Sequence, residues 1–367
     1  MIRLLEKLCA LNGVSGNEDE VREFIRNYAS KYTDEIRTDA MGNLIAVKRA
    51  AGAKADNGGT KAASQGSKAS EAKASGTPHL MIAAHMDEIG FIVRAITDTG
   101  YIKFSPVGGI DPRIAFNRKV QVADSKIPGV TGLRAVHMTP LEERSQIPQW
   151  GSMYIDIGAK DKAEAEKLVN IGDTIAFESD FVRFGSKDDF IKAKAIDDRF
   201  GCAAMLKLIE KDLPMDVTFV WTVQEEVGAR GAFGAAFSVK PDIALILEGT
   251  TSADLAGVPG HKKVTVLGDG PVLGFMDAGT IYDRGLFETL RELADENGIP
   301  WQIKGRIAGG TDAQAIQRSR EGVRVANISA PVRSIHCPNS VARISDIKKS
   351  LRLAELFIDA VANGRIK

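Results

Sequence analysis

The sequence predicts an α/β fold in which a small β domain interrupts a larger domain built on a mixed sheet with helices on both faces. Strand patterns alternate with helix patterns after residue 191. The segment 79–85, HLMIAAH, is apolar enough for a strand that is covered on both faces. Residues 89–190 instead hold short, Gly-punctuated strand patterns. We therefore expect a host domain at residues 1–88 and 191–367, and an inserted β domain at residues 89–190.

Composition excludes some classes of protein. The 367 residues allow a sizeable core, and 48 Lys and Arg balance 48 Asp and Glu, so no basic excess favours nucleic acid or an anionic membrane. Three widely spaced cysteines fit reduced thiols in a cytosol. The N-terminus lacks the pattern of a signal peptide, and no apolar run approaches the roughly 20 residues that cross a bilayer. We expect a cytoplasmic protein.

The N-terminal region predicts two helices and two short strands. An apolar stripe runs over residues 2–8, and the Gly-containing loop 11–16 ends it. Ser15 or Asn17 can cap a second helix through Tyr28, with acidic residues in its first turn. Strands follow at 35–39 and 43–48.

Residues 49–78 differ from the rest of the host domain. They are rich in Ala, Gly, Ser and Lys and contain no large apolar residue, so they cannot bury enough surface to offset their ordering entropy. We expect a flexible surface insert between two strands. A recognition tail that folds on a partner is the alternative.

The remaining elements follow the same two patterns. In the inserted domain, strands are expected at 91–96, 101–107, 119–123, 129–133, 153–158 and 173–178, with one helix at 162–169. In the host domain, strands are expected at 217–223, 243–249, 299–304 and 323–329, and helices at 200–211, 229–237 and 280–297. A further helix begins after GGTDA, and the last begins at Ser345 as N-cap, with Gly364 suited to its C-cap.

Metal-binding side chains recur where these strands end. Ligands collect at the carboxyl ends of strands in open α/β sheets. Two imidazoles and several carboxylates can hold two divalent cations about 3.5–4 Å apart, with one carboxylate shared between them. The candidates are His85, Asp87, Asp197, Glu225, Glu226, Glu248 and His336.

Local spacing suggests individual roles. His85 and Asp87 point the same way on an extended segment, so Asp87 can accept a hydrogen bond from the imidazole and fix its tautomer. Asp197 can bridge two cations. We assign Glu225 as general base and acid, and Glu226 as a ligand.

Each candidate has a structural alternative when it is taken alone. His85 and His336 could be buried structural histidines, and Asp197 with Asp198 could be an N-cap pair. The acids at 225, 226 and 248 could be solvated loop residues. Independent structural explanations for the whole set are harder to sustain, because all the sites fall at strand ends of one α/β unit.

The motifs AHMDEIGF, AIDDR, QEEVGARG, GGTDA and SIHCP occur in the order typical of one family. The chain resembles the M42 metallo-aminopeptidases, the TET and glutamyl aminopeptidase group, over nearly its whole length outside the low-complexity insert. The resemblance implies a zinc-peptidase-like α/β/α catalytic domain with a PDZ-like inserted domain used for subunit contacts. It also implies a dodecameric homo-oligomer.

The resemblance also implies how the residues divide their roles. Asp197 would bridge the two metals, one held by Glu226 and His336 and the other by His85 and Glu248. Glu225 would activate the bridging water, and Asp87 would orient His85. The GGTDA loop would lie beside the substrate, through Gly309, Gly310, Thr311 and Asp312. From the residues alone, this loop could also be a structural turn. Where relatives often have Asp, Gly and Ser, this chain has Glu248, Gln314 and Cys337.

We therefore predict a dinuclear aminopeptidase that acts on short peptides. Zinc or cobalt suits the mixed imidazole and carboxylate ligands, and manganese is compatible with them. One alternative keeps the site for another hydrolase, such as a deacylase, a carboxypeptidase-like amidase or a glycanase. A non-catalytic peptide-binding scaffold is the other. The sequence leaves the preference for the N-terminal residue, the metal used in the cell and the oligomeric state open.

Overall fold

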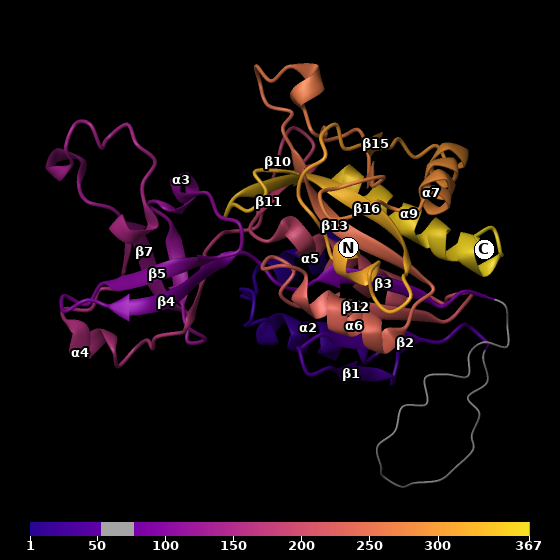
Figure 1. The fold of residues 1–367 in the computed structure, drawn as a ribbon, viewed down its shortest axis with the longest axis horizontal. Coiled ribbons are helices and arrows are strands. Elements are labelled where there is room, and N and C mark those ends of the chain that lie inside the picture. Colours follow the sequence, from indigo (N-terminus) through magenta and orange to yellow (C-terminus); the bar gives the residue numbers. More distant parts are fainter. Residues whose placement is uncertain (53–76, 367) are drawn as a thin grey trace, which may run out of the picture.

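The computed structural model describes residues 1–52 and 77–366. Most of the predicted insert at 49–78 lies outside these residues. The described chain forms a large domain that carries both chain ends and a smaller barrel domain beside it (Figure 1). This arrangement confirms the predicted mixed α/β fold with a separate small β unit.

A large mixed sheet forms the centre of the larger domain. In the described part of the chain, its main path runs β1–β2–β12–β3–β13–β16–β17–β11–β10, and the short strands β14 and β15 join beside β16. Strands β12, β3, β13 and β16 are parallel, so their carboxyl ends meet at one edge. The strands are β1 (Ile36–Thr38), β2 (Leu44–Lys48), β3 (Leu80–His85), β10 (Val182–Phe184), β11 (Phe190–Ala193), β12 (Val217–Thr222), β13 (Ile243–Ser252), β14 (Val272–Leu273), β15 (Gln302–Ile303), β16 (Arg324–Arg333) and β17 (Ser340–Arg343).

Helices cover both faces of this sheet because the central strands are apolar on both sides. In β3, Leu80, Ile82 and Ala84 pack into one core cluster, and Met81 and Ala83 pack into the other. The first cluster includes side chains of α1 (Ile2–Cys9), α2 (Asp19–Ala29), α5 (Ile196–Ile209), α7 (Arg284–Glu296) and α9 (Ile344–Ala362). The second includes α6 (Arg230–Val239) and α8 (Ala313–Ile316).

The smaller domain is a closed barrel in which the strand order is β4–β5–β8–β7–β6–β9. Its aromatic core contains Phe91, Phe104 and Phe177. The strands are β4 (Gly90–Ile96), β5 (Ile102–Val107), β6 (Lys119–Val122), β7 (Ile127–Gly132), β8 (Tyr154–Asp156) and β9 (Thr174–Phe177). Short helices α3 (Pro112–Ala115), α4 (Lys162–Ala165), η1 (Val136–Met138) and η2 (Trp150–Ser152) lie between them, and η3 (Gly260–Lys262) belongs to the larger domain.

Two predicted helix caps are wrong. The N-cap of α2 is Glu18, and the Ser15 hydroxyl instead donates to Asp87 Oδ2 at 2.6 Å. The N-cap of α9 is Arg343, so Ser345 lies inside the helix. At the other end of α9, Gly364 follows the C-cap Asn363 and has φ +70°. No helix of the described chain has both the length and the apolarity needed to cross a membrane.

Candidate metal centre

The predicted ligands converge from elements that are distant in sequence. His85 ends β3, and the turn after β12 carries Glu225 and Glu226. Asp197 lies at the start of α5, where its φ/ψ is not helical, and His336 follows β16. Glu248 lies within β13 rather than after it, because that strand continues in register with β16 as far as Ser252.

Asp197 lies between the two histidines. Its Oδ1 is 3.6 Å from His85 Nε2, and its Oδ2 is 3.6 Å from His336 Nε2. Each imidazole also faces a second carboxylate at 3.2 Å, Glu248 for His85 and Glu226 for His336. The Asp197 carboxylate therefore lies between two pairs of side chains, His85 with Glu248 and His336 with Glu226.

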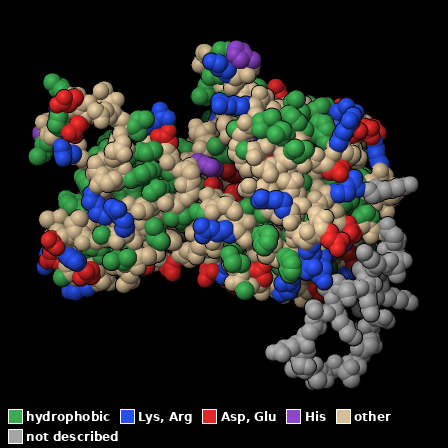
Figure 2. Space-filling model, viewed as in Figure 1, with side chains coloured by type: hydrophobic (Ala, Val, Ile, Leu, Met, Phe, Trp, Pro, Cys, Tyr) green, Lys and Arg blue, Asp and Glu red, His purple; other side chains and the backbone are tan. Residues whose placement is uncertain are grey.

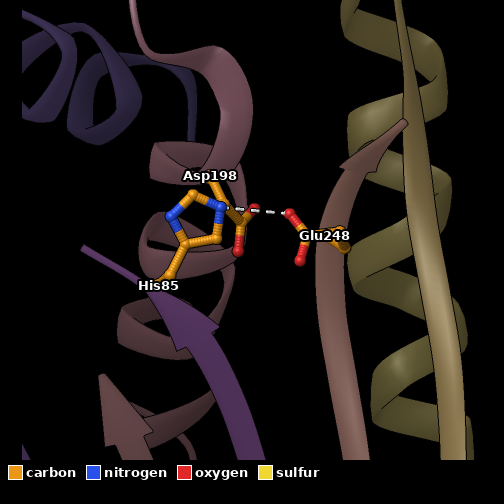
Figure 3. Close-up of side chains that lie close together, drawn as sticks. All are labelled: His85, Asp198 and Glu248. Carbon is orange, nitrogen blue, oxygen red and sulfur yellow. Dashed lines mark ion pairs between the residues drawn. The ribbon is translucent and has the colours of Figure 1, made fainter. Parts of the chain in front are cut away.

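Figure 3 shows one side of this cluster. His85 extends from the end of β3 toward Glu248 on β13, and Asp198 approaches from the start of α5. The sequence did not indicate a role for Asp198 in metal binding, but these three side chains form a group that could hold a metal ion. Asp198 Oδ1 accepts from the Gly201 N–H at 2.9 Å, whereas its buried Oδ2 has no hydrogen-bond partner in the described chain.

Burial sets the protonation of the acids. It raises the pKa of Glu226 to about 7, against the opposing charge of His336. It also raises the pKa of Glu225 and Glu248 well above the usual range. Burial lowers the pKa of His336, but the neighbouring Asp197 and Glu226 carboxylates outweigh this and raise it to about 9. Buried carboxylates and imidazoles therefore face one another in this cluster, and divalent cations would bind to such a set of donors.

The donor set fits such cations. Nitrogen and oxygen ligands of this mixture suit zinc, cobalt or manganese. Within residues 1–52 and 77–366, no Lys or Arg forms an ion pair with Asp87, Asp197, Glu226 or Glu248. Asp197, Glu226 and His336 line a pocket together with Phe177 of the barrel domain. Figure 2 shows a histidine and acidic side chains in the recess between the two domains.

Both imidazoles are held through their second nitrogen. His85 Nδ1 lies 3.1 Å from the Asp87 carbonyl and 3.5 Å from the Asp87 carboxylate. His336 Nδ1 lies 3.0 Å from the carbonyl of Gly109, which the barrel domain supplies. In each case Nε2 is left facing the carboxylates.

Asp87 also fixes the turn that carries the two glutamates. Its Oδ1 accepts from the Glu225 N–H at 3.0 Å, and its Oδ2 accepts from the Glu226 N–H at 3.1 Å. Buried Glu18 adds a second support, because its Oε1 accepts from the Gln224 N–H at 3.2 Å. The sequence did not indicate that Ser15 and Glu18 belong to the site. Their occurrence together in the segment GVSGNE, residues 13–18, was the one signal that could have indicated them.

The GGTDA loop is close to this cluster, but two of its side chains are engaged by the protein. Asp312 is buried and accepts from the Thr222 hydroxyl, and the Thr311 hydroxyl lies 3.1 Å from that of Tyr282. Gly309 and Gly310 are exposed. The backbone of the two glycines is therefore the accessible part of the loop. The Gln314 side chain packs against Gly310, where a Cβ would lie 3.1 Å from its Nε2.

A mixed α/β domain with an inserted barrel and a His/Asp/Glu cluster at the strand ends defines a peptide hydrolase of the metallo-aminopeptidase class. The family described as M42 glutamyl aminopeptidase matches residues 66–353. This chain belongs to the M42 family, and the resemblance found in the sequence is confirmed.

Individual relatives match over nearly their whole length. A protein of Acetivibrio thermocellus that carries the provisional name aminopeptidase is 39% identical, over 96% of this chain and 97% of its own. The lysyl aminopeptidase of Pyrococcus furiosus is 29% identical, over 97% and 96%.

Solved structures agree on the fold. The TET aminopeptidase of the Thaumarchaeota archaeon SCGC AB-539-E09 superposes with a TM-score of 0.87 at 31% identity, over 100% of this chain and 98% of its own. The Pyrococcus horikoshii TET1 peptidase, which can assemble into a tetrahedron or a large octahedral shell, has a TM-score of 0.79 at 31% identity, over 96% and 98%.

Proposed function

We propose that this protein is a dinuclear metal-dependent aminopeptidase that releases N-terminal residues from short peptides. The observation that carries the proposal is the position of Asp197, whose two carboxylate oxygens each face a different histidine. A carboxylate in this position suits a bridge between two ions. Asp197 with His85 and Glu248 would hold one, and Asp197 with His336 and Glu226 the other.

Two such cations, when bound, polarise a carbonyl and lower the pKa of a water. Glu225 would take a proton from the attacking water and return it to the leaving amine. Burial raises the pKa of Glu225, and the neighbouring Asp312 and Glu226 carboxylates raise it further, which favours a carboxyl that takes up a proton and returns it. Asp87 would keep His85 and the Glu225 turn in place. The exposed backbone of Gly309 and Gly310 would contact the substrate, with Thr311 and Asp312 holding the loop.

The finer assignments belong to the same proposal. Zinc or cobalt is the expected metal, with manganese compatible, and the expected compartment is the cytoplasm. The barrel domain would be the PDZ-like module through which subunits contact one another. The assemblies of the TET1 relative support a homo-oligomer, for which a dodecamer is our expectation.

Reconstitution tests the function directly. Chelated protein is reloaded with Zn, Co or Mn and assayed on aminoacyl-p-nitroanilides beside N-acylated and glycan substrates. We expect cleavage of substrates with a free amine only, dependent on metal. Cleavage of the N-acylated or glycan substrates alone would instead favour a deacylase or glycanase.

A further inference from the structure

Three buried charged side chains meet beside the metal cluster. Glu88, Lys194 and Arg199 are 3%, 4% and 0% exposed. Glu88 and Lys194 line the same pocket as Asp197 and His336. The proposed mechanism gives none of these three charges a role, although two of them lie at the wall of the candidate centre.

We call these three residues the Glu88 cluster, because both cations face one oxygen of that carboxylate. Lys194 Nζ donates to Glu88 Oε1 at 2.8 Å, and Arg199 Nη2 lies 3.6 Å from the same oxygen. In the sequence, Lys194 and Arg199 stand on either side of Asp197 and Asp198. The segment that carries Asp197 is therefore held against Glu88 at both of its ends.

Glu88 is itself fixed to the backbone around it. It follows Asp87 directly, its N–H donates to the Gly13 carbonyl at 2.8 Å, and its Oε1 accepts from the Gly13 N–H at 3.1 Å. A Cβ on Gly13 would lie 2.6 Å from Arg199 Nη2, so these segments are in close contact. Glu88 thus joins the segment after Lys194 to Asp87, which holds the turn after β12.

A further contact reaches the barrel domain. Lys194 Nζ also donates to Asn12 Oδ1 at 2.8 Å, and Asn12 Nδ2 donates to Gln121 Oε1 on β6 at 2.9 Å. Asn12 is therefore a position at which the Glu88 cluster can be weakened without the removal of a buried charge.

We infer that the Glu88 cluster positions Asp197 at equal distances from the two histidines. The inference rests on the proposed dinuclear function, because it needs Asp197 to bridge two ions. Burying three charges costs desolvation free energy that their attraction roughly offsets, so stability is not their main contribution. Their contribution is geometric, because a movement of this segment would change the two distances of 3.6 Å between Asp197 and the imidazoles.

The experiment measures metal affinity by competition with a chromophoric chelator. The variants are Lys194→Met, Glu88→Gln and the double variant. We expect each single substitution to weaken the binding of zinc by about 10- to 100-fold. Because the two residues act as one unit, the double variant should lose less affinity than the product of the two single losses.

The control is Arg324→Met, which removes hydrogen bonds to Asp283 at 2.9 and 3.1 Å. Arg324 begins β16, at the edge of the sheet opposite the metal cluster. This variant should lower the free energy of unfolding of the metal-free protein in urea but keep the wild-type metal affinity. If it loses as much metal affinity as Lys194→Met does, metal binding follows stability alone and the inference is overturned.

A spectroscopic measurement separates positioning from a general loss of structure. The visible absorption of the cobalt-loaded protein reports the geometry of the ligands. It should therefore change in Lys194→Met and Glu88→Gln and stay the same in Arg324→Met. Wild-type affinity together with an unchanged cobalt spectrum in both variants of the Glu88 cluster would overturn the inference.

Asn12→Ala decides the question if the buried charges cannot be removed without unfolding. It keeps the contact between Lys194 and Glu88 but removes one acceptor of the ammonium, so metal affinity should fall by about 2- to 10-fold. Unchanged affinity in this variant would overturn the inference. A wild type that binds fewer than two ions, or that cleaves no aminoacyl substrate, would instead overturn the proposed function.

Discussion

Glu225 and Glu226 are adjacent in sequence but have different surroundings. Glu226 faces His336 at 3.2 Å, whereas burial raises the pKa of Glu225 and the Asp312 and Glu226 carboxylates raise it further. An acid whose neighbours disfavour its charge suits proton transfer, and one that faces an imidazole suits a shared cation.

Glu225→Gln should therefore lower kcat by about 10²- to 10⁴-fold, because it removes the group that carries the proton. Metal content, measured by mass spectrometry, should stay at the wild-type value, since the substitution leaves in place the backbone N–H that donates to Asp87. Glu6→Gln, at an exposed position on α1, is the control. Full turnover by Glu225→Gln would remove Glu225 from the mechanism.

Glu18 also supports the turn that carries Glu225 and Glu226, because it accepts a hydrogen bond from the Gln224 N–H. Glu18→Ala removes the acceptor for the Gly16 and Gln224 N–H groups. Because buried donors would lose their partner, we expect the free energy of unfolding to fall by about 1–3 kcal/mol and kcat to fall with it. Glu18→Gln keeps an acceptor oxygen and should recover most of both. Chemical denaturation and steady-state kinetics measure the two effects; a Glu18→Gln variant as impaired as Glu18→Ala would assign the role to the charge.

At the scale of elements, β13 and the start of α5 approach closely at Gly249. Its N–H donates to Asp197 Oδ1 at 3.2 Å, and a Cβ there would lie only 2.6 Å from that oxygen. Gly249→Ala should displace Asp197 and weaken metal binding by about 10- to 100-fold in a competition titration. Gly260→Ala, where a Cβ meets open space, is the matched control. Unchanged affinity in Gly249→Ala would argue against Asp197 as the bridge.

Asp254 and Arg333 join the ends of β13 and β16. Arg333 donates to both oxygens of Asp254, at 2.6 and 2.7 Å. Burial raises the pKa of Asp254, but Arg333 and the Leu267 N–H outweigh it and bring the pKa to about 2. Because this pKa lies below the unfolded value of about 3.9, the pair stabilises the fold above that pH and loses its effect as pH falls toward 2.

Asp254→Asn should accordingly have a lower free energy of unfolding than the wild type at pH 6. The difference between the two proteins should become smaller as pH falls below about 4. Urea unfolding across this range measures both proteins. A difference in the free energy of unfolding that stays constant with pH would show that the charge of Asp254 does not contribute to stability.

The sequence predicted the strands that position the site better than the contacts that complete it. Long apolar runs such as residues 217–223 indicate buried strands, and acids directly after them indicate where ligands gather. Ser15 and Ser345 were misassigned as caps because local sequence shows a residue that can cap a helix but not a competing partner. The partner of Ser15 is Asp87, 72 positions away. Glu18 and the Gly109 carbonyl depend on tertiary contacts of the same kind.

At the scale of the whole molecule, the barrel domain exposes apolar side chains on one loop. Val136, Met138, Leu141 and Ile147 are 70%, 67%, 79% and 53% exposed. Exposed apolar side chains gathered on one segment are typical of surfaces that contact another protein. We expect this loop to contribute to subunit contacts.

The double variant Met138→Glu, Leu141→Asp should therefore form smaller particles than the wild type in light scattering. Phe233→Asp, which alters an exposed apolar residue on α6 of the larger domain, is the control and should keep the wild-type mass. A wild type that stays monomeric at every concentration, with metal present, would contradict the expected assembly.

The Gly109 carbonyl belongs to the barrel domain, yet it contacts His336, which lies 227 positions later in the sequence. His336 Nδ1 lies 3.0 Å from this carbonyl, so we expect a movement of the barrel relative to the larger domain to move the imidazole as well. Since we expect the barrel domain to carry subunit contacts, we also expect assembly to influence catalysis through this hydrogen bond.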